Sequence, residues 1–346
     1  MKFKALSLFA NVGIGETYLK DIGIESTVAN ELLSERVAIY KHLHPTTDMI
    51  GGDITDEEVF GNIIKSALGN KVNIIIATPP CQGMSIAGKM KADDPRNTLI
   101  VKVMESFNII KPDYMLIENV PQMLKTSIIY DNQIINIKDF MLSQIDDSYT
   151  CNFDVFDAAD YGTPQYRKRT IIRIHKKSLK WITPEKQKHI TVREAIGDLP
   201  SLEAGQSSEI KWHYAKKHND KHIHWMKNTS TGKTALENEV HYPQKDNRKI
   251  KGFATTYKRI EWDKPAPTVT MANGSISSQN NVHPGRKLKD GTYSDARVLT
   301  ILEILRVTGL PDNWNPPEHI SENTLRHVIG EAVPPLMMKA VFKGII

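Results

Sequence analysis

Between residues 4 and 175, short apolar segments alternate with segments whose apolar residues recur at helical spacing. Such an alternation predicts a doubly wound α/β fold with a mainly parallel sheet, because parallel neighbours are joined by crossover helices. Strands are expected near 4–9, 25–30, 47–51, 72–78, 113–117, 151–156 and 169–175, and helices near 15–21, 35–43, 56–68, 98–110, 121–127, 137–145, 299–307 and 335–342.

The periodicity weakens from residue 176 to about residue 295, where polar residues, Gly and Pro are frequent. The chain has 346 residues, and single cores stop growing at about 250–300 residues, so a second, smaller domain is expected. Residues 176–290 hold 22 Lys and Arg against 12 Asp and Glu, whereas the rest of the chain holds 23 against 28. This basic segment suits contacts with a phosphate backbone, and a solvated lysine-rich surface is the alternative.

The chain contains two cysteines, which give neither a disulfide framework nor a metal cluster of the usual spacing. This cysteine content is typical of a protein in a reducing cytosol. The apolar run at the start is short and leads into a glycine loop, so we do not interpret it as a signal peptide. No later segment has the length and hydropathy of a membrane span.

Cys81 follows the apolar run Ile74–Ala77 and the pair Pro79-Pro80. The β-branched run predicts a buried strand, and the prolines end it because proline cannot continue a strand ladder. In open parallel sheets, ligands bind at the carboxyl ends of the strands. Cys81 is therefore placed to act as a nucleophile, although a lone cysteine is also commonly a small buried apolar residue.

Glu118 ends a second apolar run, Tyr114–Ile117, and is expected at the same edge as Cys81. It could instead favour the positive end of a helix that begins near Pro121. Arg167 and Arg169 are two residues apart, so they share a face if the segment is extended. Paired guanidiniums can hold a carbonyl and balance a carboxylate, and surface ion pairing is the alternative.

The first expected strand leads into a loop with Gly13 and Gly15, which lets a nucleotide-type ligand approach the backbone. Tyr18 stands where the dinucleotide fingerprint has its third glycine, so that fingerprint is incomplete. Glu31 ends the second strand, where acids bind ribose hydroxyls, or it could favour a helix start. Asp53 could accept a hydrogen bond from an adenine amino group or cap the next helix.

Taken together and in order, these motifs resemble those of the DNA cytosine-5 methyltransferases. The motifs span essentially the whole chain: Phe9–Gly15, Glu31, Asp53, Pro79–Gln82, Asp94–Leu99, Glu118–Val120, Gln165–Arg169, Thr191–Pro200, Arg297–Thr300 and Gly330–Val333. The resemblance implies a Rossmann-like methyltransferase sheet that binds S-adenosyl-L-methionine, together with a target-recognition domain. It implies a catalytic domain over residues 1–176, target recognition over residues 177–296, and a segment over residues 297–346 that returns to the catalytic domain.

The resemblance also implies a mechanism. Cys81 would add to C6 of a cytosine, so that C5 becomes able to accept the methyl group. Glu118 would bind N3 of the ring, with a carboxyl pKa raised by burial. Arg169, supported by Arg167, would bind the O2 side and stabilise the developing negative charge. Because the reacting carbons lie inside the duplex, the cytosine must rotate out of it, and residues 83–96 would close over the base.

The cofactor residues follow from the same resemblance. S-adenosyl-L-methionine would be held by Phe9, Gly13, Gly15, Glu31, Asp53, Ile54, Leu99 and Val333. No metal is expected. Two departures from the family pattern stand out: the first loop is two residues longer than usual, and Glu331 replaces the usual Asn.

The expected partner is double-stranded DNA with a flipped cytosine in a short specific site, in a restriction-modification system that includes a cognate endonuclease. The protein is expected to be monomeric, away from membranes, and in the cytoplasm of a bacterium or of a phage host. A nicotinamide-dependent oxidoreductase would leave Cys81, Glu118 and the arginines without a role. A non-catalytic nucleic-acid-binding module and an RNA cytosine methyltransferase remain alternatives.

Overall fold

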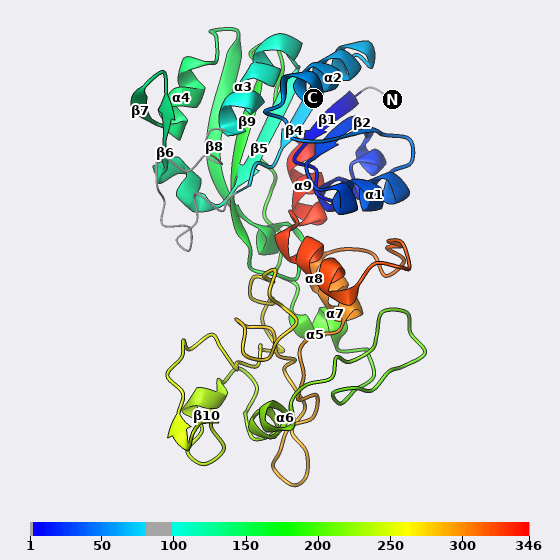
Figure 1. Ribbon diagram of the computed structural model, residues 1–346, viewed down its shortest axis with the longest axis vertical. Coiled ribbons are helices and arrows are strands. Elements are labelled where there is room, and N and C mark those ends of the chain that lie inside the picture. The colour runs from blue at the N-terminus through cyan, green and yellow to red at the C-terminus, as the bar shows by residue number, and fades with distance from the viewer. Residues whose placement is uncertain (1–2, 81–98, 346) are drawn as a thin grey trace. The chain divides into compact units, whose positions relative to one another are not determined.

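The computed structural model describes residues 3–80 and 99–345. The chain forms two compact units, each of which is built from separate stretches of sequence (Figure 1). Unit 1 comprises Met1–Asp157, Lys168–Glu185 and Met337–Ile346, and unit 2 comprises Ala158–Arg167 and Lys186–Leu336. The predicted boundaries differ from these units, because residues 297–336 cluster with unit 2 and only the last ten residues join unit 1. The functional roles assigned to the domains remain predictions.

Unit 1 is organised around a seven-stranded sheet with the order β3-β2-β1-β4-β5-β9-β8 (Figure 1). The strands are β1 (Phe3–Leu8), β2 (Ile24–Glu31), β3 (Asp48–Gly51), β4 (Ile74–Ala77), β5 (Tyr114–Asn119), β8 (Tyr149–Asp157) and β9 (Lys168–Lys176). Strands β1 to β5 pair in parallel, whereas β9 runs antiparallel to both β5 and β8. The mainly parallel, doubly wound α/β fold predicted from the sequence is therefore confirmed, together with all seven strands.

Three crossover helices pack on this sheet: α1 (Ser34–Leu43), α2 (Glu57–Gly69) and α3 (Leu99–Ile110). Helix α2 begins where the Asp56 side chain accepts the N–H groups of Glu58 and Val59, which satisfies two of the helix's free donors. In α3, apolar residues at helical spacing are buried in the main core of unit 1. Each such side chain stabilises the fold by about 1.5–3 kcal/mol through burial.

The prediction of a helix near residues 15–21 is wrong. The structure has two short 3-10 helices instead, η1 (Ile14–Glu16) and η2 (Lys20–Ile22). Gly13 and Gly23 adopt left-handed conformations with φ of 77° and 80°, so the chain turns before and after these segments. Likewise, the helix predicted near 121–127 is the 3-10 segment η5 (Pro121–Lys125).

A hairpin that the sequence analysis missed follows η5. It consists of β6 (Ser127–Tyr130) and β7 (Gln133–Asn136), and it leads into α4 (Ile137–Ser143). Asp131 and Asn132 have φ of 49° and 59°, which is the left-handed pair that a tight two-residue turn requires.

The C-terminal helix α9 (Pro335–Phe342) carries the chain back to unit 1. The indole N–H of Trp181 donates to the carbonyl of Val341 at 2.9 Å, and its ring stacks on Phe342. Trp181 follows β9, so these contacts attach the end of the chain to the antiparallel side of the sheet.

Unit 2 contains little regular structure, as predicted. Its elements are α5 (Val192–Ile196), α6 (Asp220–Lys227), η7 (Ala235–Glu237), β10 (Gln244–Lys245), β11 (Arg248–Lys249), α7 (Ile301–Thr308) and α8 (Glu322–Glu331), together with the 3-10 turn η6 (Ala158–Tyr161). Buried arginines hold the irregular segments together. Arg259 is fully buried and donates to the backbone carbonyls of Met226, His283, Ser294 and Asp295.

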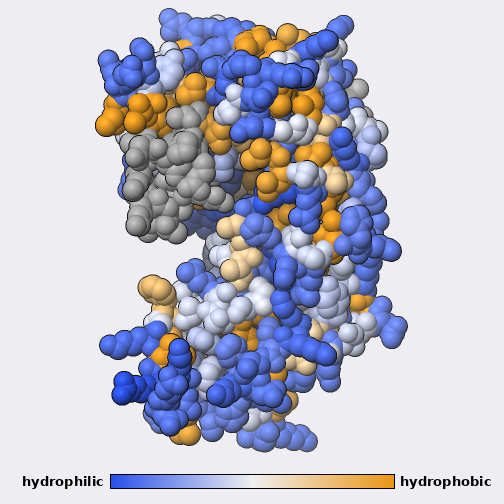
Figure 2. All heavy atoms as spheres, viewed as in Figure 1, coloured by the Kyte–Doolittle hydropathy of each residue, from blue (hydrophilic) through white to orange (hydrophobic). Residues whose placement is uncertain are grey.

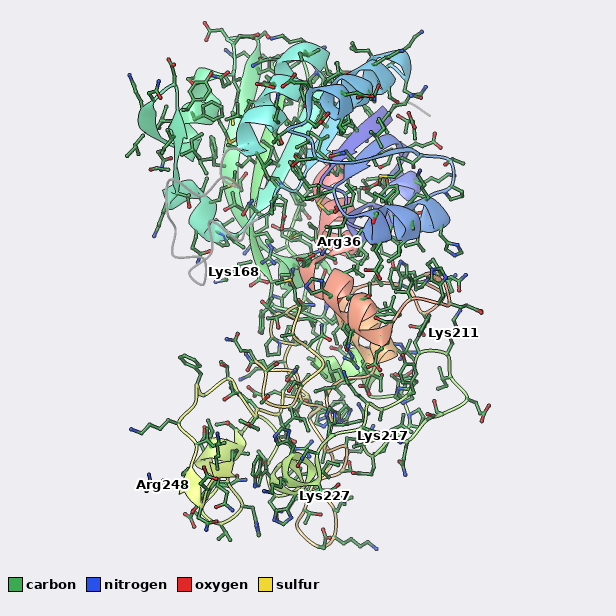
Figure 3. All side chains as sticks on the ribbon, viewed as in Figure 1. Arg36, Lys168, Lys211, Lys217, Lys227 and Arg248 are labelled. Atoms are coloured by element: carbon green, nitrogen blue, oxygen red, sulfur yellow. The ribbon has the colours of Figure 1, made fainter. Side chains whose placement is uncertain are left out.

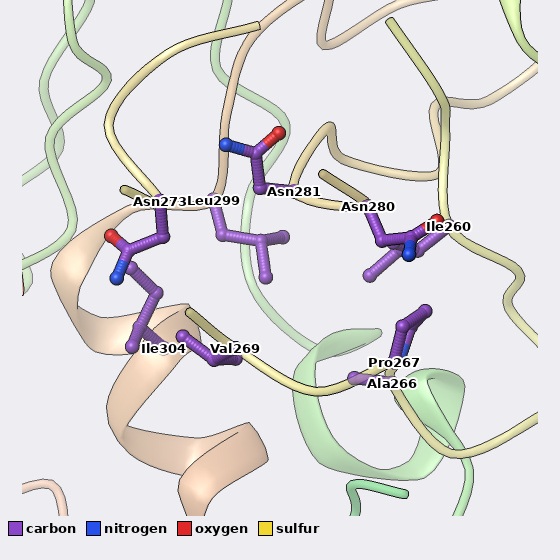
Figure 4. Close-up of a pocket in the computed structure, with 9 residues that line it drawn as sticks. All are labelled: Ile260, Ala266, Pro267, Val269, Asn273, Asn280, Asn281, Leu299 and Ile304. Carbon is purple, nitrogen blue, oxygen red and sulfur yellow. The ribbon is translucent and has the colours of Figure 1, made fainter. Parts of the chain in front are cut away.

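One gap in the described part of unit 2 is small. Its lining includes Ile260, Val269, Leu299 and Ile304 (Figure 4), and its volume of about 10 Å³ suffices for one water molecule. We therefore interpret it as a packing gap and not as a ligand site. Within residues 3–80 and 99–345, no helix is both long and apolar enough to cross a membrane.

Candidate active site

The predicted site residues of unit 1 gather at one edge of its sheet. Phe9, Glu31 and Glu118 lie at the carboxyl ends of β1, β2 and β5, which are parallel strands of one sheet. Asp53 follows β3 in the same way. This is the edge at which open α/β sheets bind their ligands.

Glu118 and Arg169 form an ion pair at this edge. Nε of Arg169 lies 2.8 Å from Oε1 of Glu118, and the two side chains are 14% and 9% exposed. The pair forms because β9 runs back along β5, with Ile171 opposite Glu118. A carboxylate and a guanidinium are thus held side by side in a largely dry setting, where both can hydrogen-bond to a polar ring.

Asn119 fixes the strand end that leads toward Cys81. Its side-chain amide donates to the carbonyl of Pro79 at 3.0 Å, and its side-chain oxygen accepts the N–H of Val120 at 2.8 Å. The last described residue before the gap is Pro80, so the chain leaves the described region beside the residue that follows Glu118. Cys81 lies outside the described residues, as does the predicted closing loop 83–96, and both predictions stay untested.

Arg167 belongs to unit 2 and is buried there. Its guanidinium donates to the carbonyl of Val269 at 2.9 Å, of Gly330 at 3.0 Å and of Glu331 at 3.1 Å. Arg167 therefore joins two distant stretches of unit 2. These contacts give Arg167 a structural task, whereas its predicted support of Arg169 is not tested.

The loop after β1 has an unusual backbone. Phe9 and Asn11 have φ of 59° and 52°, and Gly13 has φ of 77°. A Cβ atom on Gly13 would lie 2.2 Å from Nε2 of His44, so the loop packs closely on that ring. Gly15 lies within η1. The requirement for glycine at residue 13 therefore comes from both its φ and its close packing.

Glu31 is buried and accepts two backbone N–H groups. Its Oε2 accepts from Asn11 at 2.9 Å, and its Oε1 accepts from Leu33 at 3.1 Å. The carboxylate thereby ties the loop after β1 to the segment after β2. Each oxygen of a carboxylate has two lone pairs, so both retain capacity to accept a hydroxyl.

Asp53 and Ile54 differ in exposure. Oδ1 of Asp53 accepts the N–H and the hydroxyl of Thr55, and the residue is exposed. The cap of α2 is Asp56, so Asp53 closes the turn before the helix and does not cap it. Ile54 is 3% exposed and belongs to the main core of unit 1.

Leu99 and Val333, the remaining predicted cofactor residues, lie in different units. Leu99 is the first residue of α3 and packs against the core of unit 1. Val333 is 8% exposed and lies in unit 2 after Glu331, the last residue of α8.

Glu16, a buried carboxylate in the segment after β1, was not predicted as a site residue from the sequence. Its two oxygens accept from the hydroxyls of Ser7 at 2.6 Å and Tyr40 at 2.7 Å. Burial, followed by the nearby Glu16 charge, raises the pKa of Tyr40 well above its usual value. The only signal in the sequence was an acid directly after Gly15, which is too common to single it out.

Thr78 and Asn30 were also missed. The Thr78 hydroxyl donates to the carbonyl of Phe9 at 3.0 Å. The Asn30 amide donates to the carbonyls of Ile50 at 3.0 Å and Gly52 at 3.1 Å. Thr78 thus connects the ends of β4 and β1, and Asn30 connects the ends of β2 and β3. Both are polar residues at the end of an apolar strand, which is the pattern that singled out Glu118.

The other cysteine is poorly suited to be a nucleophile. Cys151 lies on β8, and burial raises the pKa of its thiol to about 12. A thiol with such a pKa is almost wholly protonated at neutral pH, and the thiolate is the reactive form. Among the described residues, no group of three or more His, Cys, Asp or Glu side chains is arranged to hold a metal ion.

Comparisons with known proteins agree with this arrangement. Residues 3–346 match the family described as C-5 cytosine-specific DNA methylase. The chain is 50% identical to the type II methyltransferase M1.HgaI of Avibacterium volantium, over 98% of this chain and 97% of that protein. It is 27% identical to the type II methyltransferase M1.HphI of Haemophilus parahaemolyticus, over 100% of this chain and 87% of that protein. Among solved structures, the Entamoeba histolytica methyltransferase EhMeth superposes with a TM-score of 0.68 at 14% identity, covering 99% of this chain and 97% of that one, which supports the fold alone. The chain belongs to the C-5 cytosine-specific DNA methylase family.

Proposed function

We propose that this DNA cytosine-5 methyltransferase acts on a short specific duplex site through a covalent bond between Cys81 and C6 of a flipped cytosine. The observation that carries the proposal is the Glu118–Arg169 ion pair, 2.8 Å long and largely buried at the carboxyl end of β5. It is supported by Asn119, which holds the carbonyl of Pro79 and so the strand end that leads toward Cys81.

In this mechanism, the Cys81 thiolate adds to C6 and electron density shifts to C5. Glu118 takes up a proton and donates a hydrogen bond to N3 of the ring, which favours the addition by drawing charge away from C6. Arg169 binds the O2 side and stabilises the negative charge as it develops. After methyl transfer, the C5 proton is lost and Cys81 leaves as the thiolate that began the reaction. Arg167 acts as a positioning residue through the carbonyls that it holds in unit 2.

The residues at the carboxyl edge of unit 1 fit S-adenosyl-L-methionine. The two oxygens of Glu31 each accept one backbone N–H and keep capacity for the ribose hydroxyls. Phe9 and the Gly13–Gly15 loop would hold the methionine part and the adenine, Asp53 and Ile54 would contact the adenine, and Leu99 and Val333 would add packing. When bound, the cofactor supplies a methyl group on a sulfonium, and the residues of the chain orient it.

The biological setting that we propose is type II restriction-modification, because the relatives M1.HgaI and M1.HphI are type II methyltransferases. The methylated site would then be shielded from a cognate endonuclease. We further propose a bacterial cytoplasmic location and a monomeric enzyme, since one chain supplies every residue that the mechanism uses.

The test is expression in a host without cytosine methylation, followed by bisulfite sequencing of the DNA. We expect methylated cytosines in one short recurring sequence with the natural chain, and none with Cys81→Ser. Cys151→Ser is the matched control, because it removes the other thiol, and it should leave methylation intact. Methylation that survives Cys81→Ser would refute the covalent mechanism, and modification confined to RNA would refute the substrate.

A further inference from the structure

Strands β10 and β11 of unit 2 form a tight hairpin with a fixed shape. Lys245 pairs with Arg248 across the ladder, next to the turn. The two turn residues, Asp246 and Asn247, have φ of 50° and 58°, the conformation of a type I′ turn. All residues of the two strands and the turn are exposed. The hairpin therefore owes its geometry to its turn and its base, and not to burial.

The charges on this hairpin are unbalanced. Residues directly opposite in an antiparallel pair point to the same face, so Lys245 and Arg248 place two positive charges side by side, which is unfavourable. In the described part of the chain, no carboxylate lies within the 4.0 Å ion-pair distance of either side chain. Lys249 and Lys251 add further positive charge, and Asp246 is the one acid in residues 244–251.

The base of the hairpin is held firmly. The N–H of Ile250 donates to the carbonyl of Pro243 at 2.9 Å. The side-chain amide of Asn238 donates to the carbonyl of His241 at 2.8 Å and to the hydroxyl of Thr229 at 3.0 Å. The hairpin is thus presented by a fixed backbone. Figure 3 labels Arg248 on it, away from α7 of the same unit.

Phe253 follows the hairpin and is 77% exposed. Its backbone is nevertheless fixed, because its carbonyl accepts both the N–H and the hydroxyl of Thr256 at 2.9 Å. The preceding Gly252 packs so closely that a Cβ atom would lie 3.0 Å from Leu236. On the face shown in Figure 2, the surface of unit 2 is mostly hydrophilic. The ring of Phe253 is therefore exposed to water beside basic residues, and its burial by a binding partner would be favourable.

We propose that the β10–β11 hairpin is a DNA-contacting element, in which Lys245 and Arg248 bind backbone phosphates and Phe253 packs against a base. Phosphates would remove the repulsion between the two paired cations. The major groove of B-DNA, about 12 Å wide, admits a two-stranded β-ribbon. In the major groove, a phenylalanine ring can make apolar contact with the methyl group of thymine. The proposal rests on the duplex DNA substrate proposed above.

The first experiment measures duplex binding of Lys245→Ala/Arg248→Ala across several salt concentrations, by fluorescence anisotropy with a duplex that contains the site found by bisulfite sequencing. Each phosphate contact contributes about 0.9 to the slope of log K against log salt, so the slope should fall by about 1.8. The KM for DNA should rise, whereas kcat at saturating DNA should be retained, because the hairpin is remote in sequence from every catalytic residue.

The matched control is Lys177→Ala/Lys180→Ala, which also removes two exposed positive charges. These residues follow the end of β9, where His175 pairs with Tyr114, the first residue of β5. They therefore lie at the amino ends of the parallel strands, at the edge of the sheet opposite the candidate active site. The control should keep the natural slope. An unchanged slope in the hairpin variant, or an equal fall in both variants, would overturn the proposal.

A second variant, Phe253→Ala, separates the apolar contact from the charge. We expect it to weaken duplex binding about 5- to 100-fold with no change in the salt slope. Binding equal to the natural chain would overturn the role of the ring. Circular dichroism and S-adenosyl-L-methionine affinity should match the natural chain, which shows that the variant is folded. If the natural chain itself fails to methylate DNA, the proposed function fails; if it methylates and the hairpin variants bind normally, this inference alone fails.

Discussion

The buried ion pair between Glu118 and Arg169 can be tested by removing its partners one at a time and together. The atoms are 2.8 Å apart and the side chains 9% and 14% exposed. Removing one partner of a fully buried pair costs about 3–5 kcal/mol, because it leaves a charge without compensation. The remaining exposure lets water screen part of that charge, so we expect about 2–3 kcal/mol of lost stability for Glu118→Gln and for Arg169→Met.

The double variant leaves no uncompensated charge, so its loss should be smaller than the sum of the two single losses by at least about 1.5 kcal/mol. Urea denaturation of the four proteins, followed by far-UV circular dichroism, measures this coupling. The exposed pair Lys111–Asp146, 3.3 Å long, is the matched control, and its double-mutant cycle should show no coupling above error. If the stability losses of Glu118→Gln and Arg169→Met sum to the loss of the double variant within about 0.5 kcal/mol, the reasoning is refuted.

Two further predictions concern the candidate active site of unit 1, and a third concerns the buried core of unit 2. Asn119→Asp replaces the donor to the carbonyl of Pro79 with an acceptor, so we expect kcat to fall with little change in the KM for the cofactor, measured by radiolabelled methyl transfer. Gly13→Ala should weaken cofactor binding in calorimetry through its φ of 77° and the ring packed against it, whereas Gly61→Ala in α2, where a Cβ atom meets nothing within 4 Å, should not. Burial alone would raise the pKa of Glu303, but the charge of Arg297 outweighs burial, and the net result is a pKa lowered to about 2. The stability that the ionised carboxylate contributes is therefore fully present above its ordinary pKa and is lost as the pH falls toward 2. Glu303→Gln should remove this loss of stability at acidic pH, as measured by urea denaturation at several pH values.

The sheet of unit 1 could be predicted because its information is local. Runs such as Ile74–Ala77 and Tyr114–Ile117 combine β-branched or apolar residues with a polar residue or proline directly after them. That pattern sets both the strand and its end, and parallel pairing then brings the ends together. Glu31 and Glu118 were placed at the carboxyl edge from the sequence for this reason, and the structure has them there.

Unit 2 could not be predicted in the same way, because long-range polar contacts hold it together. Arg297 is fully buried between Asp295 and Glu303, and it also donates to the carbonyl of Leu202. Arg259 is fully buried as well. No periodicity distinguishes such residues from solvated arginines. Helices α6 and α8 were missed for a related reason, since polar and charged residues interrupt their short apolar stripes.

The contrast between Arg167 and Arg169 shows where sequence spacing fails as a guide. Two residues apart in an extended strand share a face, which is why the pair was predicted to act together. However, β9 begins at Lys168, so the alternation applies to Arg169 and not to Arg167. The boundary between the two units also falls between residues 167 and 168. Arg169 therefore pairs with the carboxylate of Glu118, whereas Arg167 donates to the backbone of unit 2, and one short motif supplies a guanidinium to each of the two units.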